Sequence, residues 1–410
     1  MTRLFKLAWR DIWRNRRRTF LTMGAILFAV LLISLANSVQ FGTYDAMEEL
    51  LVRMYSGDVQ IHREGFHAEQ TLSYSMEQDE IDWASLKARY PWASAASRRV
   101  TGFGLASSDS SSAGAMIVGI EPEAEREISI FASTPSEGQP LTGSRGAVLV
   151  GETLAQNLGV TIGDSIVVLT QGYRNVMGAE LYAVTGLLRT GSPDIDRSML
   201  VMSLADAQSL LAMEGRITQL VIRTDDFRKA VSYAGVLHAD LEDSDVEIMS
   251  WRAMMPELEQ MRTLDDAGNY VFYFFLVLII AFEIFNTTTM SMMERVREFG
   301  VMMSVGMKPH QISILVALGL ALKVLLALLA GLVLASLALG YLAQNPIPLP
   351  ENMQEMYQDF GFSMDSVSFS TNPKIFVFPM VSVAAAALLS MVYPILRMRR
   401  FSPVEALRKT

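Results

Sequence analysis

The sequence contains no cysteine among its 410 residues. Without thiols, the chain can form neither a disulfide framework nor a zinc or iron–sulfur site with cysteine ligands. Histidine is also scarce, with four residues, and the closest pair, His62 and His67, matches no metal-ligand spacing. We therefore interpret both as strand or surface histidines and expect this chain to bind no metal and no cofactor.

The sequence also lacks the short motifs that mark common enzymes. It has no GxxxxGK(S/T) phosphate-binding loop, no HExxH, no GxSxG and no glycine-rich dinucleotide motif after a strand. Two acidic groups, Glu121–Glu127 and Asp194–Asp196, are expected at loops or helix ends, where a solvated surface explains them. The chain is predicted to be non-catalytic.

Four long apolar runs are what the sequence does contain. Apolar residues make up 51% of the chain, and the mean hydropathy is +0.28. A helix needs about 20 consecutive apolar residues to cross a bilayer, and the first run is longer than the apolar core of a cleaved signal peptide. We predict four transmembrane helices, at 20–41, 269–293, 312–343 and 375–396.

Charge is distributed unevenly around these runs. The first 19 residues contain many basic residues and Asp11 as their only acid, and the tail 397–410 is also basic, whereas 42–266 is acidic. Because positive charge accumulates on the cytoplasmic side of the membrane, we predict a membrane protein with both termini in the cytoplasm. The region 42–266 and the loop 344–374 are then on the external side.

The basic segment 1–19 has apolar residues at nearly helical spacing and two tryptophans, Trp9 and Trp13. It is predicted to be a cytoplasmic interfacial helix that contacts the lipids of an anionic leaflet. A nucleic-acid-binding arm is the alternative interpretation. Because an apolar run starts at Phe20, we expect a membrane-associated segment and no nucleic-acid partner.

The region 42–266 alternates strand-like runs with short helical stretches, which indicates an α+β domain large enough for two lobes. The predicted fold is therefore an α-helical membrane protein with four transmembrane helices and a large α+β extracytoplasmic domain inserted between helices 1 and 2. The strand-like runs are DVQIH, RRVTGFGLA, AMIVGI, AVLVG, SIVVLT, LYAVTGLL, SMLVM, QLVIRT and VEIMSW.

Two ionisable residues, Glu283 and Lys323, fall inside predicted spans. A charge at that depth is costly, so each is expected to face the helix bundle or a partner. A direct pair between them and a proton-relay role are both open. We favour a structural or subunit contact.

The segment 294–310 between the second and third spans is predicted to be a polar helix with two faces. Val296, Phe299 and Met303 share one face, and Arg295, Glu298 and Met302 share another. An amphipathic helix between two spans is suited to binding a cytoplasmic partner, so we predict that it couples this partner to the transmembrane helices. The candidate coupling residues are Glu294, Arg295, Arg297, Glu298, Met302 and Gly306.

These features together resemble the MacB/FtsX-type permeases of ABC transporters, which include the LolC/LolE lipoprotein-releasing subunits. The similarity includes the order of one span, a large external domain and three spans. It also includes the run ERVREFG at 294–300, the opening LAWRDIWRNRRRT, the closing FSPVEALRKT, and the outer segments LVGETLAQNLGVTIGDSIVVLT and SLADAQSLL. The segment SGDVQIHREGF is similar to the lipoprotein-releasing branch.

The resemblance implies a mechanotransmission (type VII) transporter in which a separate ABC ATPase dimer binds ATP and Mg²⁺ beneath two permease chains. The second permease is a copy of this chain or a paralogue, and the substrate is an amphipathic molecule such as a lipoprotein. Two alternatives stay open: an FtsX-like scaffold that activates a cell-wall hydrolase, and a peptide or antibiotic exporter with a periplasmic adaptor. The expected substrate-access residues are Val39, Tyr44, Met47, Leu51, Tyr270 and Phe274.

Overall fold

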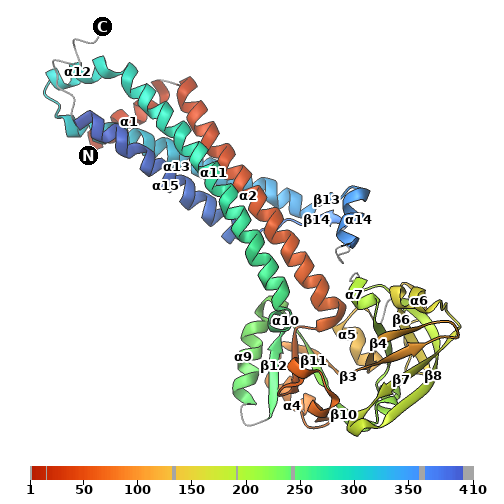
Figure 1. The fold of residues 1–410 in the computed structure, drawn as a ribbon. Helices are drawn as coiled ribbons and strands as arrows, with labels where there is room; N and C mark the ends of the chain where they lie inside the picture. Colours follow the sequence, from red (N-terminus) through yellow and green to blue (C-terminus); the bar gives the residue numbers. More distant parts are fainter. Residues whose placement is uncertain are drawn as a thin grey trace. The chain divides into compact units, whose positions relative to one another are not determined.

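The computed structural model describes residues 2–14, 16–131, 135–190, 193–241, 245–359 and 365–399. The chain divides into two compact units (Figure 1). The helical unit comprises Met1–Asp45, Arg262–Pro348 and Ser366–Thr410, and the sheet unit comprises Ala46–Met261 and Leu349–Asp365.

Four long helices are apolar enough to cross a membrane. They are α2 (Arg16–Leu51), α11 (Pro256–Glu294), α13 (Pro309–Gln344) and α15 (Lys374–Arg399). Their apolar windows have mean hydropathies of 2.0 to 2.7, and each of the four predicted spans lies within one of them. At 1.5 Å per residue, the three longest exceed the roughly 30 Å of a bilayer core, and α2 and α11 contribute residues to both units.

Small side chains and polar contacts hold the four helices together. Gly331 of α13 lies so close to α2 that an added Cβ would come within 3.1 Å of the Val30 Cβ. Ser390 of α15 donates to the Ala281 carbonyl of α11 at 2.9 Å, and Asn37 of α2 donates to the Ile375 carbonyl at 3.2 Å. Close backbone approach and interhelical hydrogen bonds are typical of helices packed inside a bilayer.

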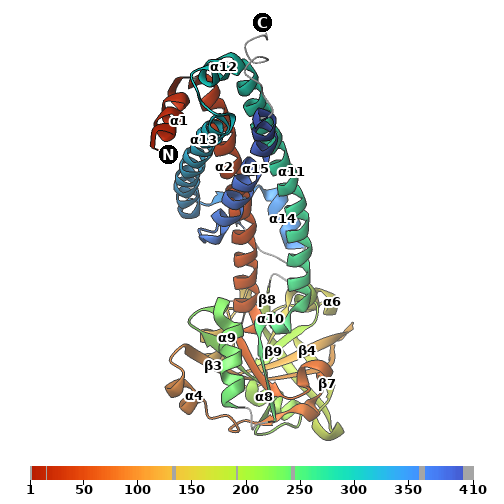
Figure 2. The ribbon, with the colours of Figure 1, turned by 90° about the vertical axis from the view of Figure 1, so that its left-hand side faces the viewer.

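Two short helices lie at one end of the helical unit (Figures 1 and 2). The amphipathic helix α1 (Thr2–Arg14) buries Ala8 and Ile12 and packs against α13, while Trp9 and Trp13 stay exposed. The other helix, α12 (Val296–Ser304), connects α11 to α13. Within the basic segment 1–19, residues 2–14 form α1 and residues 16–19 belong to the start of α2.

The sheet unit is built on a ten-stranded mixed sheet of order β12-β1-β11-β3-β4-β9-β6-β8-β5, with β7 pairing β3 and β8. The pairs β4–β9 and β6–β8 are parallel and the other pairs are antiparallel. Its strands are β1 (Val59–Arg63), β3 (Ala93–Ser107), β4 (Ser112–Ile120), β5 (Glu137–Gly138), β6 (Ala147–Gly151), β7 (Ser165–Gln171), β8 (Met177–Leu188), β9 (Met199–Ser203), β11 (Gln219–Thr224) and β12 (Val246–Ser250).

The strand-like runs of the sequence therefore correspond to strands, and all of them lie in sequence between α2 and α11. Small two-stranded ladders join β2 (Met76–Glu77) to β10 (Arg216–Ile217) and β13 (Ile347–Pro348) to β14 (Ser366–Val367). The shorter helices are η1, a π-helix (Val52–Ser56), α3 (Phe66–Glu69), α4 (Trp83–Arg89), α5 (Pro122–Ile128), α6 (Glu152–Leu158), α7 (Pro193–Asp196), α8 (Leu204–Leu210), α9 (Ala230–Asp240), α10 (Trp251–Met254), α14 (Glu351–Asp359) and the 3₁₀ turns η2 (Leu72–Tyr74), η3 (Tyr173–Asn175) and η4 (Phe227–Lys229).

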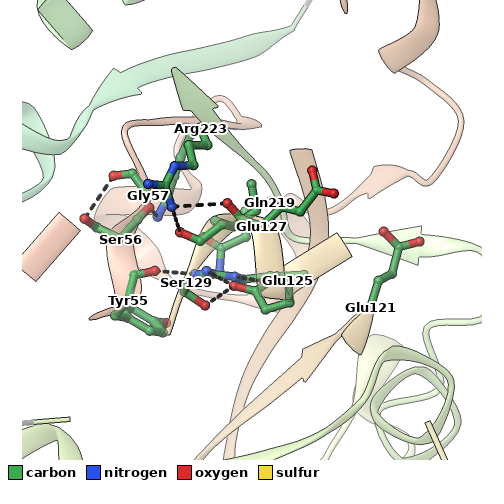
Figure 3. A network of polar contacts seen from close by, with 12 residues as sticks. Tyr55, Ser56, Gly57, Glu121, Glu125, Glu127, Ser129, Gln219 and Arg223 are labelled. Carbon is green, nitrogen blue, oxygen red and sulfur yellow. Dashed lines mark hydrogen bonds and ion pairs between the residues drawn. The ribbon is translucent and has the colours of Figure 1, made fainter. Parts of the chain in front are cut away.

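A buried ion pair lies at the centre of the sheet unit (Figure 3). The side chains of Arg99 on β3 and Glu125 on α5 are both 0% exposed, and their atoms Nη2 and Oε1 are 2.5 Å apart. Arg99 also donates to the Tyr55 carbonyl at 2.6 Å, and Ser129 donates to Glu125 at 2.5 Å. Burial opposes ionisation of Glu125, but the Arg99 charge and these hydrogen bonds outweigh it and hold the pKa below its usual range.

The expectation that the two acidic groups are solvated is therefore wrong for Glu125, because its partner comes from a distant strand. It is also wrong for Asp196, which is 5% exposed and accepts hydrogen bonds from the Thr190 N–H and hydroxyl at 2.8 and 2.7 Å. Burial raises the pKa of Asp196, and the bonds from Thr190 oppose this rise. The carboxylates of Glu125 and Asp196 therefore have structural roles, since both accept hydrogen bonds within the fold.

Glu125→Gln is expected to destabilise the sheet unit by about 3 kcal/mol, because it leaves the Arg99 charge buried without its counter-charge. For a unit of this size, that loss lowers the unfolding midpoint by roughly 6–12 °C. Thermal unfolding of the full chain in detergent measures it, with Glu123→Gln at an 81% exposed carboxylate as the matched control. Equal midpoints for the two variants would contradict the structural role.

Candidate functional site

Opposite charges gather where α12 meets the N-terminal helices. Arg18 of α2 donates to both carboxylate oxygens of Glu294, the last residue of α11, at 2.5 and 2.7 Å. Arg14 of α1 pairs with Glu298 of α12, and Arg295 lies 3.0 Å from the same carboxylate. The basic N-terminal segment thus supplies arginines to an intramolecular charge cluster, which we define as Arg14, Arg18, Glu294, Arg295 and Glu298.

The charge cluster is half-exposed rather than buried. The Glu298 side chain is 40% exposed and that of Arg14 is 54% exposed. The hydrogen bond from Arg14, followed by that from Arg295, lowers the pKa of the Glu298 carboxyl, so Glu298 is ionised at neutral pH. A single pair at this exposure contributes about 0.2–1 kcal/mol, and the cluster joins α1, α2, α11 and α12 through several such contacts.

A small cavity of about 40 Å³ adjoins the cluster and is lined by three cationic side chains, those of Arg18, Arg295 and Lys323. Arg295 also lies over the Phe299 ring, 5.2 Å from its centroid. Lys323 is half-buried and lines this cavity together with residues of α2, α11 and α12. Glu283 instead accepts a hydrogen bond from Thr287 at 3.0 Å and is exposed on α11, outside this cavity lining.

The predicted helix over 294–310 is shorter in the structure. Glu294 ends α11, Arg295 caps α12, and α12 ends at Ser304. Gly306 has a φ of +101°, a conformation that glycine adopts without strain, and the chain turns there. Pro309 then starts α13, because a proline at the first helical position loses no hydrogen bond.

The six predicted coupling residues have different environments. Glu294, Arg295 and Glu298 are held in the charge cluster, and Met302 packs against the small core formed by Met292, Phe299 and Ile312. Arg297 and Gly306 are exposed. The buried side of α12 carries Val296 and Phe299, and the surface that points away from them is exposed.

Two valines that the sequence reasoning did not select dominate this exposed surface. Val301 is 51% exposed and Val305 is 83% exposed. They are four residues apart, so they are neighbours on the helix surface, and the exposed Arg297 and Lys308 flank them. We call these four residues the exposed α12 face. Their spacing opposite Val296 and Phe299 was the signal that could have identified them.

The six expected substrate-access residues are not gathered into one lining. Tyr44 is 7% exposed, donates to Asp265 at 2.8 Å and lies beneath the Arg262 guanidinium. Met47 is buried, Val39 is half-buried, and the side chain of Leu51 lies outside those that the structure describes. Tyr270 and Phe274, by contrast, are 58% and 61% exposed on α11.

Helix α11 has the least buried apolar window of the four long helices, at 17% against 39–44% for the others. Its exposed residues are therefore available to lipid or to a second chain. Within the part of the chain that the structure describes, no three His, Asp or Glu side chains form a group that could hold a metal ion.

Comparison with known proteins decides the family. The MacB-like periplasmic core domain family matches residues 19–232, just over half of the chain, and the FtsX-like permease C-terminal family matches residues 270–403. The chain belongs to the MacB/FtsX-type permease family. The resemblance seen in the sequence is thereby confirmed, and with it an inner-membrane permease whose family indicates no catalytic activity.

Curated relatives include the lipoprotein-releasing system transmembrane protein LolC of Xylella fastidiosa (strain Temecula1), which is 23% identical over 304 residues, covering 72% of this chain and 73% of the relative. LolC of Neisseria meningitidis serogroup B is 21% identical over 311 residues, with the same coverage. The periplasmic region of MacB from Actinobacillus actinomycetemcomitans aligns with a TM-score of 0.35 and 14% identity, covering 50% of this chain and 94% of that structure.

Arg18→Glu is expected to destabilise the helical unit by about 1 kcal/mol, because it places two acids against each other at Glu294. The exchange Arg18→Glu with Glu294→Arg restores opposite charges, so the double variant should recover most of the lost stability. Thermal unfolding of the full chain in detergent measures the coupling as a double-mutant cycle. Arg17→Glu, at an exposed neighbouring position, is the control, and strictly additive losses would exclude the pair.

Proposed function

We propose that this chain is the permease subunit of an ATP-driven ABC transporter that extracts or exports an amphipathic substrate, a lipoprotein, at the outer leaflet of the inner membrane. The observation that carries the proposal is the exposed α12 face, an apolar pair flanked by basic residues between two candidate spans. Family membership and the similarity to LolC over 72% of the chain support the transporter class and the kind of substrate.

The proposed orientation places α1, α12 and both termini in the cytoplasm, and the sheet unit and the loop 344–374 in the periplasm. Basic residues at the start of α2 and on α1 favour this orientation under the positive-inside rule, as does the acidic character of 42–266. The exposed tryptophans of α1 suit the headgroup level of a membrane interface.

We infer that ATP and Mg²⁺ are bound by a separate ATPase dimer and that this chain binds neither. In this proposal the ATPase docks on the exposed α12 face, where it buries Val301 and Val305 and meets Arg297 and Lys308 with acidic side chains. Closure of the ATPase dimer then moves α12, and the charge cluster passes the movement to α2 and α11 as rigid helices. A second permease, the same chain or a paralogue, would use exposed residues of α11.

The combined variant Val301→Asp and Val305→Asp should abolish co-purification of the ATPase, because it forces two unpaired charges into the proposed interface. A loss of at least tenfold in affinity, equivalent to about 1.4 kcal/mol, is expected. The measurement is ATPase binding to the full chain in nanodiscs. Val231→Asp, at a 55% exposed valine of the sheet unit, is the matched control, and equal binding by all forms would refute docking on this face.

The combined variant Arg295→Ala and Glu298→Ala should separate ATP hydrolysis from release. Because it weakens the charge cluster while the exposed α12 face remains, the ATPase should still assemble but substrate release should fall several-fold. Lipoprotein release from proteoliposomes and ATPase activity are measured together. Unchanged lipoprotein release by this variant would contradict the coupling role. Activation of a cell-wall hydrolase without any lipoprotein release would favour the signalling scaffold.

A further inference from the structure

The sheet unit contains a cavity of about 210 Å³ that the proposed coupling does not use. Its lining comes from η1, β1, α3, β3, β4, β11 and the end of α10, so distant parts of the sequence build one space. An apolar cavity of about 150 Å³ is large enough to bind benzene. This cavity therefore has room for a small organic group.

The wall is mainly apolar. Phe66, Phe103, Met116, Met254 and Met255 form its apolar part. Neutral polar side chains also line it, those of Ser56, Gln60, Gln70, Thr101 and Gln219, and the described lining includes no aspartate, glutamate, lysine or arginine. A charged ligand would lose its hydration here without gaining a counter-charge. The cavity therefore suits a neutral ligand with an apolar body.

His62 lines this cavity and is 2% exposed, and its buried Nδ1 lacks a hydrogen bond from any described residue. The other ring nitrogen, Nε2, lies 2.8 Å from the Gln60 side-chain oxygen. The Gln60 amide nitrogen donates to the Ser56 carbonyl at 2.6 Å, which orients this side chain. Because an amide oxygen only accepts, Nε2 carries the proton and Nδ1 is a bare acceptor.

The His62 imidazole is neutral at physiological pH. Burial, with a smaller contribution from His67, lowers its pKa to about 4. A buried acceptor without a donor is costly in free energy, so a group that supplies an O–H or N–H to Nδ1 would be bound preferentially.

An exposed apolar strip continues from the cavity wall. Phe103 and Leu105 share one face of β3, because side chains two residues apart in a strand point to the same side. Leu105 pairs with Leu169 on β7, and Val167 on β7 pairs with Leu181 on β8. All five are at least 36% exposed, so an apolar chain longer than the cavity could continue along this surface.

We propose that the cavity binds a neutral amphiphile, with a hydroxyl or amide N–H that donates to His62 Nδ1 and an acyl chain that lies against Phe103, Met116 and Met255. This binding site goes beyond the proposed coupling function and does not depend on it. Its occupant would contact η1, which directly follows α2, and Met255, which directly precedes α11. Occupancy would therefore be communicated to the chain segments that join both helices.

The test uses the full chain in phosphatidylcholine nanodiscs, with empty nanodiscs as the blank, and isothermal titration of four probes that share one chain length. These are 1-octanoylglycerol, N-octanoylglycinamide, methyl octanoate, which has no donor, and the octanoate anion. We expect the donor-bearing probes to bind at least tenfold more tightly than methyl octanoate, and octanoate not to bind. Preference for octanoylglycerol identifies a lipid hydroxyl, and preference for the glycinamide identifies a peptide amide.

The variant His62→Phe keeps an apolar ring in the wall and should abolish the discrimination between octanoylglycerol and methyl octanoate. His238→Phe, at an exposed histidine of α9, should retain it. Met255→Trp, which fills the cavity from its edge, should weaken every probe and keeps the test valid if His62→Phe fails to fold. Equal affinities for all probes, no binding at all, or discrimination that survives in a folded His62→Phe protein would overturn the proposal.

Discussion

The helical unit depends on the placement of charge at the ends of its apolar helices. A span tolerates almost no charge along its length, so Arg18 lies near the start of α2 and Glu294 at the end of α11, where they meet. Sliding one helix past the other by a single turn would separate these groups by about 5.4 Å. The pair therefore sets the register of α2 against α11, and Glu298 extends the same restraint to α1 and α12.

In the sheet unit, by contrast, a pair of opposite charges is buried in the interior. Arg99 and Glu125 are fully buried, and the cost of removing both from water offsets much of their attraction. The pair contributes more to positioning η1 than to net stability, because Arg99 also donates a hydrogen bond to the Tyr55 carbonyl of η1. It thereby fixes the segment that follows α2 onto β3 and α5. His62 lies on β1 in the same unit, and its buried Nδ1 has no hydrogen-bond donor among the described residues.

The sequence was sufficient for features with a local cause. Apolar runs predicted the four helices, strand-like runs predicted the strands, and the ERVREFG run located the connection between the second and third spans. Contacts between distant residues could not be predicted: Glu294 and Glu298 pair with arginines 276 and 284 positions away. Glu125 was mistaken for a surface acid for the same reason, since Arg99 lies 26 residues earlier on another element.

The candidate coupling residues on α12 were selected without distinguishing the inward and outward sides of this helix. Charged residues in an amphipathic helix suggest an outward side, so Arg295 and Glu298 were preferred over Val301 and Val305. That inference fails here because a neighbouring helix supplies the counter-charges and leaves apolar residues in solvent. The substrate-access residues were chosen from their position near the outer ends of the first two spans, and among them the Tyr44 hydroxyl donates a hydrogen bond to Asp265.

The two sides of α12 have different mechanical consequences. A partner that covers Val301 and Val305 gains about 1.5–3 kcal/mol for each fully buried side chain, without disturbing any contact inside the chain. Detaching α12 would expose Phe299, 5% exposed and packed with Met292 and Ile312, and would break the charge cluster as well. Removing a large aromatic side chain from its packing alone costs about 3–5 kcal/mol. The free energy that holds α12 inward is therefore similar in size to the free energy that a partner gains by covering both valines.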